Sequence, residues 1–295
     1  MTEAQRITGA LKGKWYGRYG VACCPAHGDR NPSLTLADGL NGRLLAHCKA
    51  GCTFTSILDA LRSLGVIEGA GKPPKADPRE MAAQEEQQRR EAEKRERQAV
   101  ACWNEAMPIR GTIAEIYLRQ RGISCDLPDA LRFHPECWHG ATARRIPAMV
   151  ALVEGGARFA VHRTYIRSDG TGKADAAPCK AMLGACAGGA VRLTEAQHPL
   201  VVAEGVETAM SLASGLLCGP ATVWAALSTS GMSGLRLPGG RPGKLTVATD
   251  GDAPGRTAGS TLAQRASALG WTVSILPAPD GRDWNDILRL KGAAV

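Results

Sequence analysis

In the C-terminal part of the chain, short apolar runs alternate with segments whose apolar residues recur at helical spacing. Strands that alternate with helices are typical of a parallel sheet covered by helices, with functional residues at the carboxyl ends of the strands. We therefore expect an α/β domain over residues 199–295. Its predicted strands are 200–205, 221–227, 244–252 and 271–277, and its predicted helices are 206–216 and 256–270.

The preceding segment, residues 101–198, has a different pattern. Residues 115–124 predict a helix that ends at Gly122, because glycine readily takes the left-handed conformation found after helix C-termini. The apolar runs 148–154 and 158–166, the second followed by the turn sequence SDGTG, predict antiparallel strands. We therefore expect a mixed α+β subdomain before the parallel sheet.

Residues 72–98 are dense in Glu, Arg, Gln and Ala and carry almost no large apolar side chain. Prolines block a helix at the start of this segment, but the composition after them favours helix strongly. Opposite charges four residues apart, such as Glu86 and Arg90, add roughly 0.3 kcal/mol each. Without an apolar stripe a coiled coil is not expected. Residues 71–100 are therefore predicted to be a charged helical linker that follows a small N-terminal domain, residues 1–70.

Length, charge and hydropathy narrow the class of protein. The 295 residues suffice for about two domains, and the net charge of +8 is compatible with a polyanionic partner. No apolar run is long enough to span a bilayer, and the N-terminus lacks the apolar core of a secretion signal. We therefore expect a cytoplasmic protein without membrane contact, in which cysteines stay reduced.

Cysteine and histidine are clustered near the N-terminus in two short-spaced pairs. The pairs are Cys24 with His27 and Cys48 with Cys52. Three thiolates and one imidazole suit tetrahedral zinc, and with all four positions filled the zinc would be structural rather than catalytic. Residues 34–48 predict a small hairpin between the pairs, and a unit of this size would need the metal in order to fold. Cys23 and His47 adjoin the predicted ligands and are the alternatives to them.

Acidic residues follow two of the predicted strands. Asp250 and Asp252 come directly after the run that ends at Thr249, and Glu204 ends the strand before the helix 206–216. Residues i and i+2 of a strand lie on the same side, and like charges held that close repel unless a cation lies between them. Carboxylates, water and substrate phosphates are the ligands that Mg²⁺ prefers. Taken alone, an Asp-Gly-Asp segment is most often a solvated turn. Together with Glu204, and with each acidic motif directly after a predicted strand, it predicts a magnesium site.

The sequence CPAHGDRNPSL, followed by HCKAGC, resembles the zinc-binding domain of bacterial-type DNA primases, such as those carried by phages and plasmids. The second cysteine pair is spaced by three residues here rather than by two. The strand-Glu-Gly and strand-Asp-x-Asp motifs resemble the Toprim fold, found in primases, type IA and II topoisomerases and some nucleases. These resemblances imply a Rossmann-like, mainly parallel catalytic domain that follows a small zinc ribbon.

The resemblance to Toprim proteins also implies the roles of the acidic residues. Glu204, Asp250 and Asp252 would lie side by side at the edge of the sheet, bind Mg²⁺ or Mn²⁺ and act in catalysis of phosphoryl transfer. Many primases carry an aspartate four residues after the motif glutamate, whereas this chain has Thr208 there. The number of catalytic metal ions is therefore left open.

Two further groups leave alternatives open. Asp283 lies in a turn that resembles the one after the last Toprim strand of primases and would be another metal ligand, with Asp286 as the competing choice. Equally, Asp283 or Asn285 could cap the helix that follows. The sequence RFHPECWHG offers three more metal-binding side chains, whose mixed spacing favours a structural role over a second metal site. They are His134, Cys137 and His139.

A basic stretch before the Toprim motifs resembles the primase segment that lines the nucleotide and template groove. Its APCKAMLG sequence makes Lys180 the leading candidate for a nucleotide phosphate, with Arg163 second. Arg256, just beyond the Asp-x-Asp motif, could reach a phosphate or merely begin a helix. An ordinary surface charge explains each of these residues about equally well.

As a whole, the resemblance implies a DNA primase that makes short RNA primers on single-stranded DNA from ribonucleoside triphosphates, for phage or plasmid replication. Zinc and magnesium or manganese would be its cofactors, and the zinc module would recognise the template. No phosphate-loop motif is present, so a replicative helicase would be a separate partner or would not be used. A Toprim nuclease and a non-catalytic DNA-binding replication protein are the alternatives.

Overall fold

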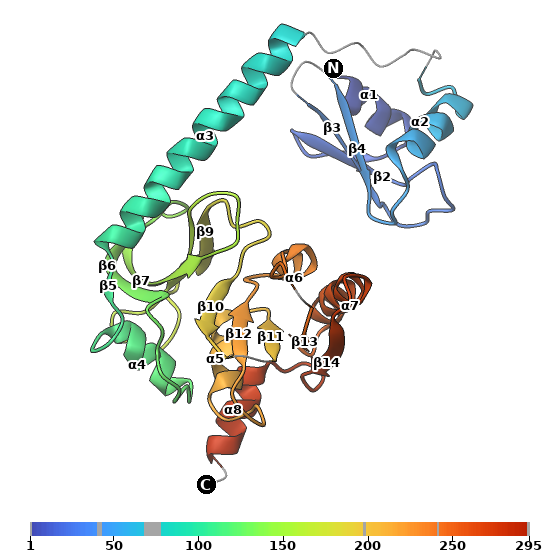
Figure 1. Cartoon of the computed structure of the whole chain (residues 1–295). Coiled ribbons are helices and arrows are strands. Elements are labelled where there is room, and N and C mark those ends of the chain that lie inside the picture. The colour runs from blue at the N-terminus through green and yellow to red at the C-terminus, as the bar shows by residue number, and fades with distance from the viewer. Residues whose placement is uncertain (1, 40–42, 68–77, 197–198, 241, 294–295) are drawn as a thin grey trace. The chain divides into compact units, whose positions relative to one another are not determined.

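The computed structural model describes residues 2–39, 43–67, 78–196, 199–240 and 242–293 (Figure 1). The chain divides into two compact units, Met1–Met81 and Ala82–Val295. None of the helices in these described ranges combines the length and the apolar character needed to cross a membrane.

The N-terminal unit is a four-stranded antiparallel sheet with two helices. In sheet order the strands are β1 (Lys14–Trp15), β2 (Tyr19–Ala22), β3 (Leu34–Asp38) and β4 (Leu44–Cys48), and the helices are α1 (Glu3–Ala10) and α2 (Phe54–Ser63). Ile7 of α1 and Ile57 of α2 pack on Leu34 and Leu36 of β3, which builds a small apolar core. The pairing of β3 with β4 confirms the predicted hairpin.

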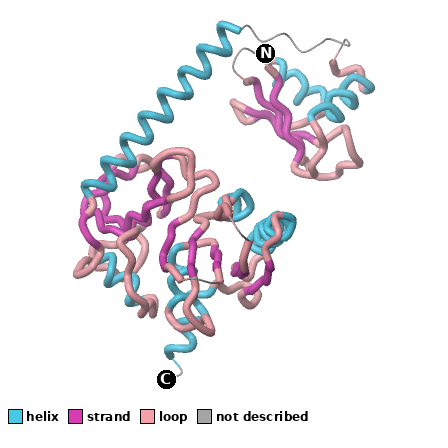
Figure 2. The backbone as a smooth tube through the Cα atoms, viewed as in Figure 1, coloured by secondary structure: helices cyan, strands magenta, loops and turns pink. Residues whose placement is uncertain are grey.

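A helix of 28 residues, α3 (Pro78–Glu105), covers the described part of the predicted linker and continues past it (Figure 2), whereas residues 71–77 of that prediction lie outside the described residues. On its exposed part Glu86 pairs with Arg90, as their spacing predicts. The C-terminal turns are different, because Ala99 and Cys102 are buried in an apolar cluster with side chains of the neighbouring sheet. The end of α3 therefore belongs to the core of the second unit.

An antiparallel sheet follows α3, and its five strands succeed one another in sheet order. The predicted strands 148–154 and 158–166 are confirmed as β7 and β8, whereas β5, β6 and β9 were not predicted. Charged and polar residues interrupt β6, and its pairing with β7 shifts register between His134 and Cys137. The elements are β5 (Met107–Pro108), α4 (Ile113–Gln120), β6 (Leu131–His139), β7 (Arg144–Val153), β8 (Ala160–Tyr165) and β9 (Lys180–Gly184).

The C-terminal sheet has the order β10-β12-β11-β13-β14, with β10 antiparallel and the other four strands parallel. All four predicted strands and both predicted helices are present, and so is the α/β class with a mixed α+β segment before it. The strand β10 and the short helix α6 were not predicted, and α8 is the helix expected after Asp283. The elements are β10 (Val191–Thr194), β11 (Leu200–Ala203), α5 (Val206–Ala213), β12 (Thr222–Ala225), α6 (Thr229–Gly234), β13 (Lys244–Thr249), α7 (Ala253–Ala268), β14 (Thr272–Pro277) and α8 (Trp284–Ala293).

Successive residues of β11 enter two different cores, because side chains alternate across a strand. Val201 packs in a core that includes Tyr117 of α4 and Leu131 of β6, so this core joins the parallel sheet to the antiparallel subdomain. Val202 packs on the other face with Leu262 of α7. The parallel sheet is thus covered on both faces, and its functional residues are left at the ends of its strands.

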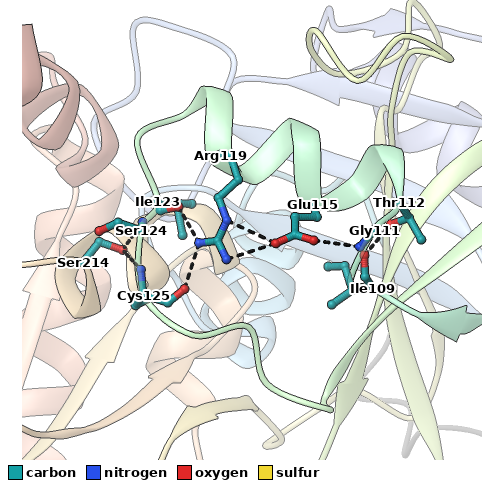
Figure 3. Close-up of polar contacts among 9 residues, drawn as sticks. All are labelled: Ile109, Gly111, Thr112, Glu115, Arg119, Ile123, Ser124, Cys125 and Ser214. Atoms are coloured by element: carbon teal, nitrogen blue, oxygen red, sulfur yellow. Dashed lines mark hydrogen bonds and ion pairs between the residues drawn. The ribbon is translucent and has the colours of Figure 1, made fainter.

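Polar contacts fasten α4 and the following loop to α5 (Figure 3). Glu115 pairs with Arg119 one turn later, and the guanidinium also donates a hydrogen bond to the carbonyl oxygen of Cys125. The hydroxyl of Ser214, just after α5, accepts a hydrogen bond from the amide of Cys125. Gly122 follows α4 with a φ of 78°, the left-handed conformation predicted for it. These contacts fix α4 relative to α5, the helix that follows Glu204.

Candidate functional site

The N-terminal unit brings four metal-binding side chains together from two loops and a strand end. They are Cys24, His27, Cys48 and Cys52, whose ligand atoms all lie within 4.8 Å of one another. Three sulfur atoms and one ring nitrogen at this separation match the donor set of a structural zinc ion, so the group could bind zinc. The neighbouring Cys23 and His47 are outside the group.

The thiols of this group differ in acidity. Burial would raise the pKa of Cys48, but the amides of Cys52 and Ala50 and the hydroxyl of Ser33 stabilise its thiolate and lower the pKa to about 6. Burial raises the pKa of Cys24 to about 12. Because zinc binds the thiolate form, binding would release a proton from Cys24.

Four acidic side chains, here called the carboxylate group, surround the carboxyl ends of β11 and β13. These two strands are direct neighbours in the parallel sheet. Glu204 follows β11 and Asp250 follows β13, so the sheet itself sets them side by side. Asp252 is the N-cap residue of α7, and its Oδ1 atom accepts a hydrogen bond from the amide of Gly255 at 2.7 Å. The fourth member, Asp283, lies just before α8.

Gly251, between the two aspartates, has no room for a side chain. A Cβ atom at this position would overlap the carbonyl oxygen of Pro279. The Gly251 amide donates to the carbonyl oxygen of Arg282 at 2.8 Å, and its own carbonyl accepts from the amide of Gly281 at 2.9 Å. These bonds hold the turn before α8, and with it Asp283, against the end of β13.

Asp250 lies in a poor environment for a negative charge. Burial, together with the charges of Glu204, Asp283 and Asp252, raises its pKa to about 7. Its Oδ1 atom is buried and has no hydrogen-bond partner among the described residues. A buried carboxylate oxygen without a partner, surrounded by three other carboxylates, is a setting that a divalent cation stabilises. The residues therefore fit a Mg²⁺ or Mn²⁺ site.

The pKa of Glu204 is shifted less than that of Asp250. Burial and then the charge of Asp252 raise its pKa, whereas Lys180 and the amide of Thr229 act in the opposite direction. The ligand atoms of the carboxylate group are also more widely spaced than those of the Cys/His group. Among the described residues, the Cys/His group is the one whose ligand atoms all lie within 4.8 Å of one another. Wider spacing suits Mg²⁺, which keeps several water or substrate oxygens among its ligands.

Asp283 serves as a helix cap as well as a neighbouring charge. Its Oδ1 atom accepts a hydrogen bond from the amide of Asp286 at 2.8 Å, and Asp286 returns a carboxylate to the amide of Asp283 at 3.2 Å. This reciprocal pair caps α8. Asn285 is buried and bonds to the carbonyl oxygen of Arg121 and the hydroxyl of Ser211, so it docks α8 rather than capping it.

A largely buried ion pair links the antiparallel sheet to α5. The Lys180 Nζ atom, at the start of β9, lies 2.8 Å from Oε2 of Glu207, and the Tyr117 hydroxyl donates to Oε1 at 2.9 Å. Glu207 is only 3% exposed. Burial would raise its pKa, but Lys180 and Lys173 hold that pKa well below its usual range. The Lys180 side chain keeps 33% exposure, so a buried anion fixes it while it still reaches solvent.

Lys180 also stands next to the carboxylate group. Its charge opposes the effect of burial on the pKa values of Glu204 and Asp250. Its Nζ atom lies 3.8 Å from where a Cβ atom on Gly205 would be. The sequence predicts Lys180 here but not its partner Glu207, since a glutamate in the first turn of a helix is usually exposed. Thr208, in the place of the aspartate of many primases, is buried.

The other two basic candidates lie in different surroundings. The register of β8 and β9 puts Arg163 on the face of the sheet opposite to Lys180. There the Arg163 guanidinium donates to the carbonyl oxygen of Trp138 at 3.1 Å. Arg256, in the first turn of α7, forms an ion pair with Asp280. Of the three predicted basic residues, the structure brings Lys180 to the carboxylate group.

The side chains of His134, Cys137 and His139 do not converge on a common point. His134 lies 3.1 Å from a carboxylate oxygen of Glu105. The two ring nitrogens of His139 contact a threonine hydroxyl and a backbone carbonyl oxygen. The Cys137 sulfur faces the sulfur of Cys102 at 3.8 Å. The three residues therefore have separate partners.

Comparison with known proteins identifies the C-terminal domain. Residues 199–294 match the Toprim domain model, and residues 93–193 match a domain of unknown function, DUF7146. No curated protein matches the chain. The chain is similar to the crystal structure of the Aquifex aeolicus primase, comprising zinc-binding and RNA polymerase domains (14% identity, 100% of this chain and 81% of that chain, TM-score 0.42). It is also similar to a DNA primase domain from Pseudomonas aeruginosa (17% identity, 55% of this chain and 52% of that chain, TM-score 0.32).

The C-terminal third of the chain is a Toprim domain. With the Cys/His group upstream of it, the chain has the two modules by which its sequence resembles bacterial-type primases, and this resemblance is confirmed at the level of the modules. The α/β fold class predicted for the C-terminal domain is confirmed as well.

Proposed function

We propose that the chain is a DNA primase that makes short RNA primers on single-stranded DNA by metal-dependent nucleotidyl transfer. The observation that supports this most directly is the carboxylate group beside Lys180 at the carboxyl edge of a Toprim sheet. Anionic ligands for a divalent ion and a fixed ammonium group are the two features that a nucleoside triphosphate requires of its site.

In this proposal Glu204, Asp250, Asp252 and Asp283 hold Mg²⁺ or Mn²⁺. A bound ion of this kind neutralises phosphate charge and favours deprotonation of the attacking 3′-hydroxyl. Lys180 pairs with a phosphate oxygen of the incoming nucleotide, since its ammonium is oriented by Glu207 and remains partly exposed. Arg256, at the start of α7, is a second basic side chain for a phosphate and lies on the Toprim domain itself.

The N-terminal unit offers a surface suited to single-stranded DNA. The rings of Tyr16 and Tyr19 stack 5.4 Å apart, and both side chains are exposed. The ammonium of Lys14 lies over the ring of Tyr16 at 5.4 Å. Exposed aromatic rings next to basic groups bind nucleic acid bases and phosphates together. We assign template binding to this unit, and replication of a phage or plasmid to the protein as a whole.

A priming assay tests the proposal. Wild-type protein with single-stranded DNA, labelled ribonucleotides and Mg²⁺ should yield short RNA products that depend on the template. The Asp250→Ala variant should lose them while it still binds DNA. Asp129→Ala, a change at an exposed aspartate in the loop before β6, is the matched control and should keep them.

Other outcomes identify the alternatives. If wild type yields no RNA but cleaves the same DNA in a manner that requires Asp250, the protein is a Toprim nuclease. If it binds DNA and does neither, a non-catalytic replication protein replaces the primase.

A further inference from the structure

Two cysteines on different elements face each other in the second unit. Cys102 lies in the last turn of α3 and Cys137 on β6, and their sulfur atoms are 3.8 Å apart. Both belong to one buried cluster with Ala99, Val161 and other apolar side chains, and they are 8% and 1% exposed. The contact is therefore built into the packing of α3 on the antiparallel sheet.

An irregularity in β6 creates this contact. Leu131 and Phe133 point into the core shared with the parallel sheet. Simple alternation would place Cys137 on that same face, since it lies an even number of residues away. The register shift after His134 inserts one residue, and Cys137 consequently joins the cluster on the α3 side.

A cavity of about 460 Å³ gives small molecules a path to both sulfur atoms. Its lining includes Cys102, Cys137, His134, Trp138, Arg145 and Arg163. A small, uncharged oxidant can enter such a space although neither cysteine is open on the surface.

The surroundings also separate the roles of the two thiols. The hydrogen bond from Cys102, and then the charge of Arg163, outweigh burial and lower the pKa of Cys137 to about 6. The same hydrogen bond, together with burial, raises the pKa of Cys102. One sulfur is thus suited to react as a thiolate, and the other retains its proton.

We propose that Cys102 and Cys137 form a peroxide-reactive dithiol that closes to an intramolecular disulfide. The Cys137 thiolate attacks one oxygen of hydrogen peroxide, the O–O bond breaks, and a sulfenic acid and hydroxide result. The Cys102 sulfur then attacks the sulfenic sulfur, and its proton leaves with the hydroxyl group as water. Two thiols and one peroxide give one disulfide and two waters, so the two electrons lost by sulfur reduce the O–O bond.

The disulfide would join the end of α3 to β6 covalently. It would fix the end of the helix, where Ala99 and Cys102 are buried in the apolar cluster and Trp103 packs against it. This chemistry goes beyond primer synthesis and does not depend on it, because neither cysteine belongs to the carboxylate group.

Mass spectrometry of the full, zinc-loaded chain tests the proposal. After mild treatment with hydrogen peroxide and alkylation of free thiols, we expect a cross-linked peptide pair containing Cys102 and Cys137, about 2 Da lighter than the two free thiols. Dithiothreitol should reverse it. The half-buried Cys125 and Cys186 should still be alkylated at that dose. Oxidation of these two while Cys102 and Cys137 remain alkylated as free thiols would overturn the proposal.

Single variants test the two roles. In Cys102→Ser the sulfenic acid on Cys137 has no resolving thiol, so dimedone should label Cys137. In Cys137→Ser, Cys102 should stay unlabelled. Labelling of Cys102 instead would contradict the assignment.

Arg163→Met should slow disulfide formation several-fold, and Cys125→Ser, the control, should leave the rate unchanged. An unchanged rate in Arg163→Met would contradict the part given to the cation.

Discussion

The Cys/His cluster and the carboxylate group each comprise four side chains, but they are assembled in different ways. The first takes its residues from two short segments of a small unit and is compact. The second takes its residues from the ends of two strands and the starts of two helices, spread from Glu204 to Asp283. The comparison teaches that a local group can organise a small unit around a metal, whereas a distributed group is set in place by a fold that exists without it.

Removal of zinc is expected to show the largest difference between the two regions, because it should unfold the N-terminal unit and leave the Toprim sheet folded. Structural zinc contributes roughly 10–16 kcal/mol in small fingers, more than the core of such a unit can replace. Chelation, or Cys48→Ser, should therefore expose the amides of β2 to β4 to rapid hydrogen exchange, while those of β11 and β13 stay protected. Cys23→Ser is the control and should have no effect. Continued protection of β2 to β4 after chelation would contradict the metal dependence of this unit.

A substitution can break the ion pair between Lys180 and Glu207, which lies next to the carboxylate group. In Glu207→Gln the ammonium of Lys180 loses a largely buried counter-charge, and breaking such a pair costs about 3 kcal/mol. Urea unfolding of the second unit should show the loss. Glu86→Gln, on the exposed part of α3, should change stability by less than about 0.5 kcal/mol. Equal effects of the two substitutions would mean that the ion pair does not hold the domain together.

Gly251→Ala is expected to have a smaller effect on stability. The new methyl group would meet the carbonyl oxygen of Pro279, and relief of such overpacking typically costs about 1–3 kcal/mol. Because the turn before Asp283 would shift, divalent metal binding should weaken as well. Gly234→Ala, where a Cβ atom has open space, is the control. Metal binding at the wild-type level in Gly251→Ala would show that the turn need not hold Asp283 in place.

The smallest expected effect is the pH dependence of the stability that the ion pair between Lys180 and Glu207 contributes. The pKa of Glu207 is lowered in the folded state, so its contribution is present above the unfolded value of about 4.3 and is lost as pH falls below it. The difference in unfolding free energy between wild type and Glu207→Gln should be constant from pH 5 to 7 and shrink at lower pH. A difference that grows on acidification would contradict this sign.

Local pattern predicted a large part of this structure. The four parallel strands follow from their apolar runs, and the four members of the Cys/His group follow from their spacing. The strands β6 and β9 could not be predicted, because polar residues interrupt them and the neighbouring strands decide their pairing. Glu207 and the Cys102–Cys137 contact escaped prediction for a related reason. Each depends on elements far apart in the sequence, and neither leaves a local signal.

The central claim, that the four carboxylates form a divalent metal site, is tested most directly by Mn²⁺ binding followed by electron paramagnetic resonance. Zinc-loaded wild-type protein should bind Mn²⁺ saturably, and Asp250→Asn should lose this binding although it removes a poorly placed charge and leaves the fold intact. The Asp129→Asn control should match wild type. Equal Mn²⁺ binding by all three proteins would contradict the account.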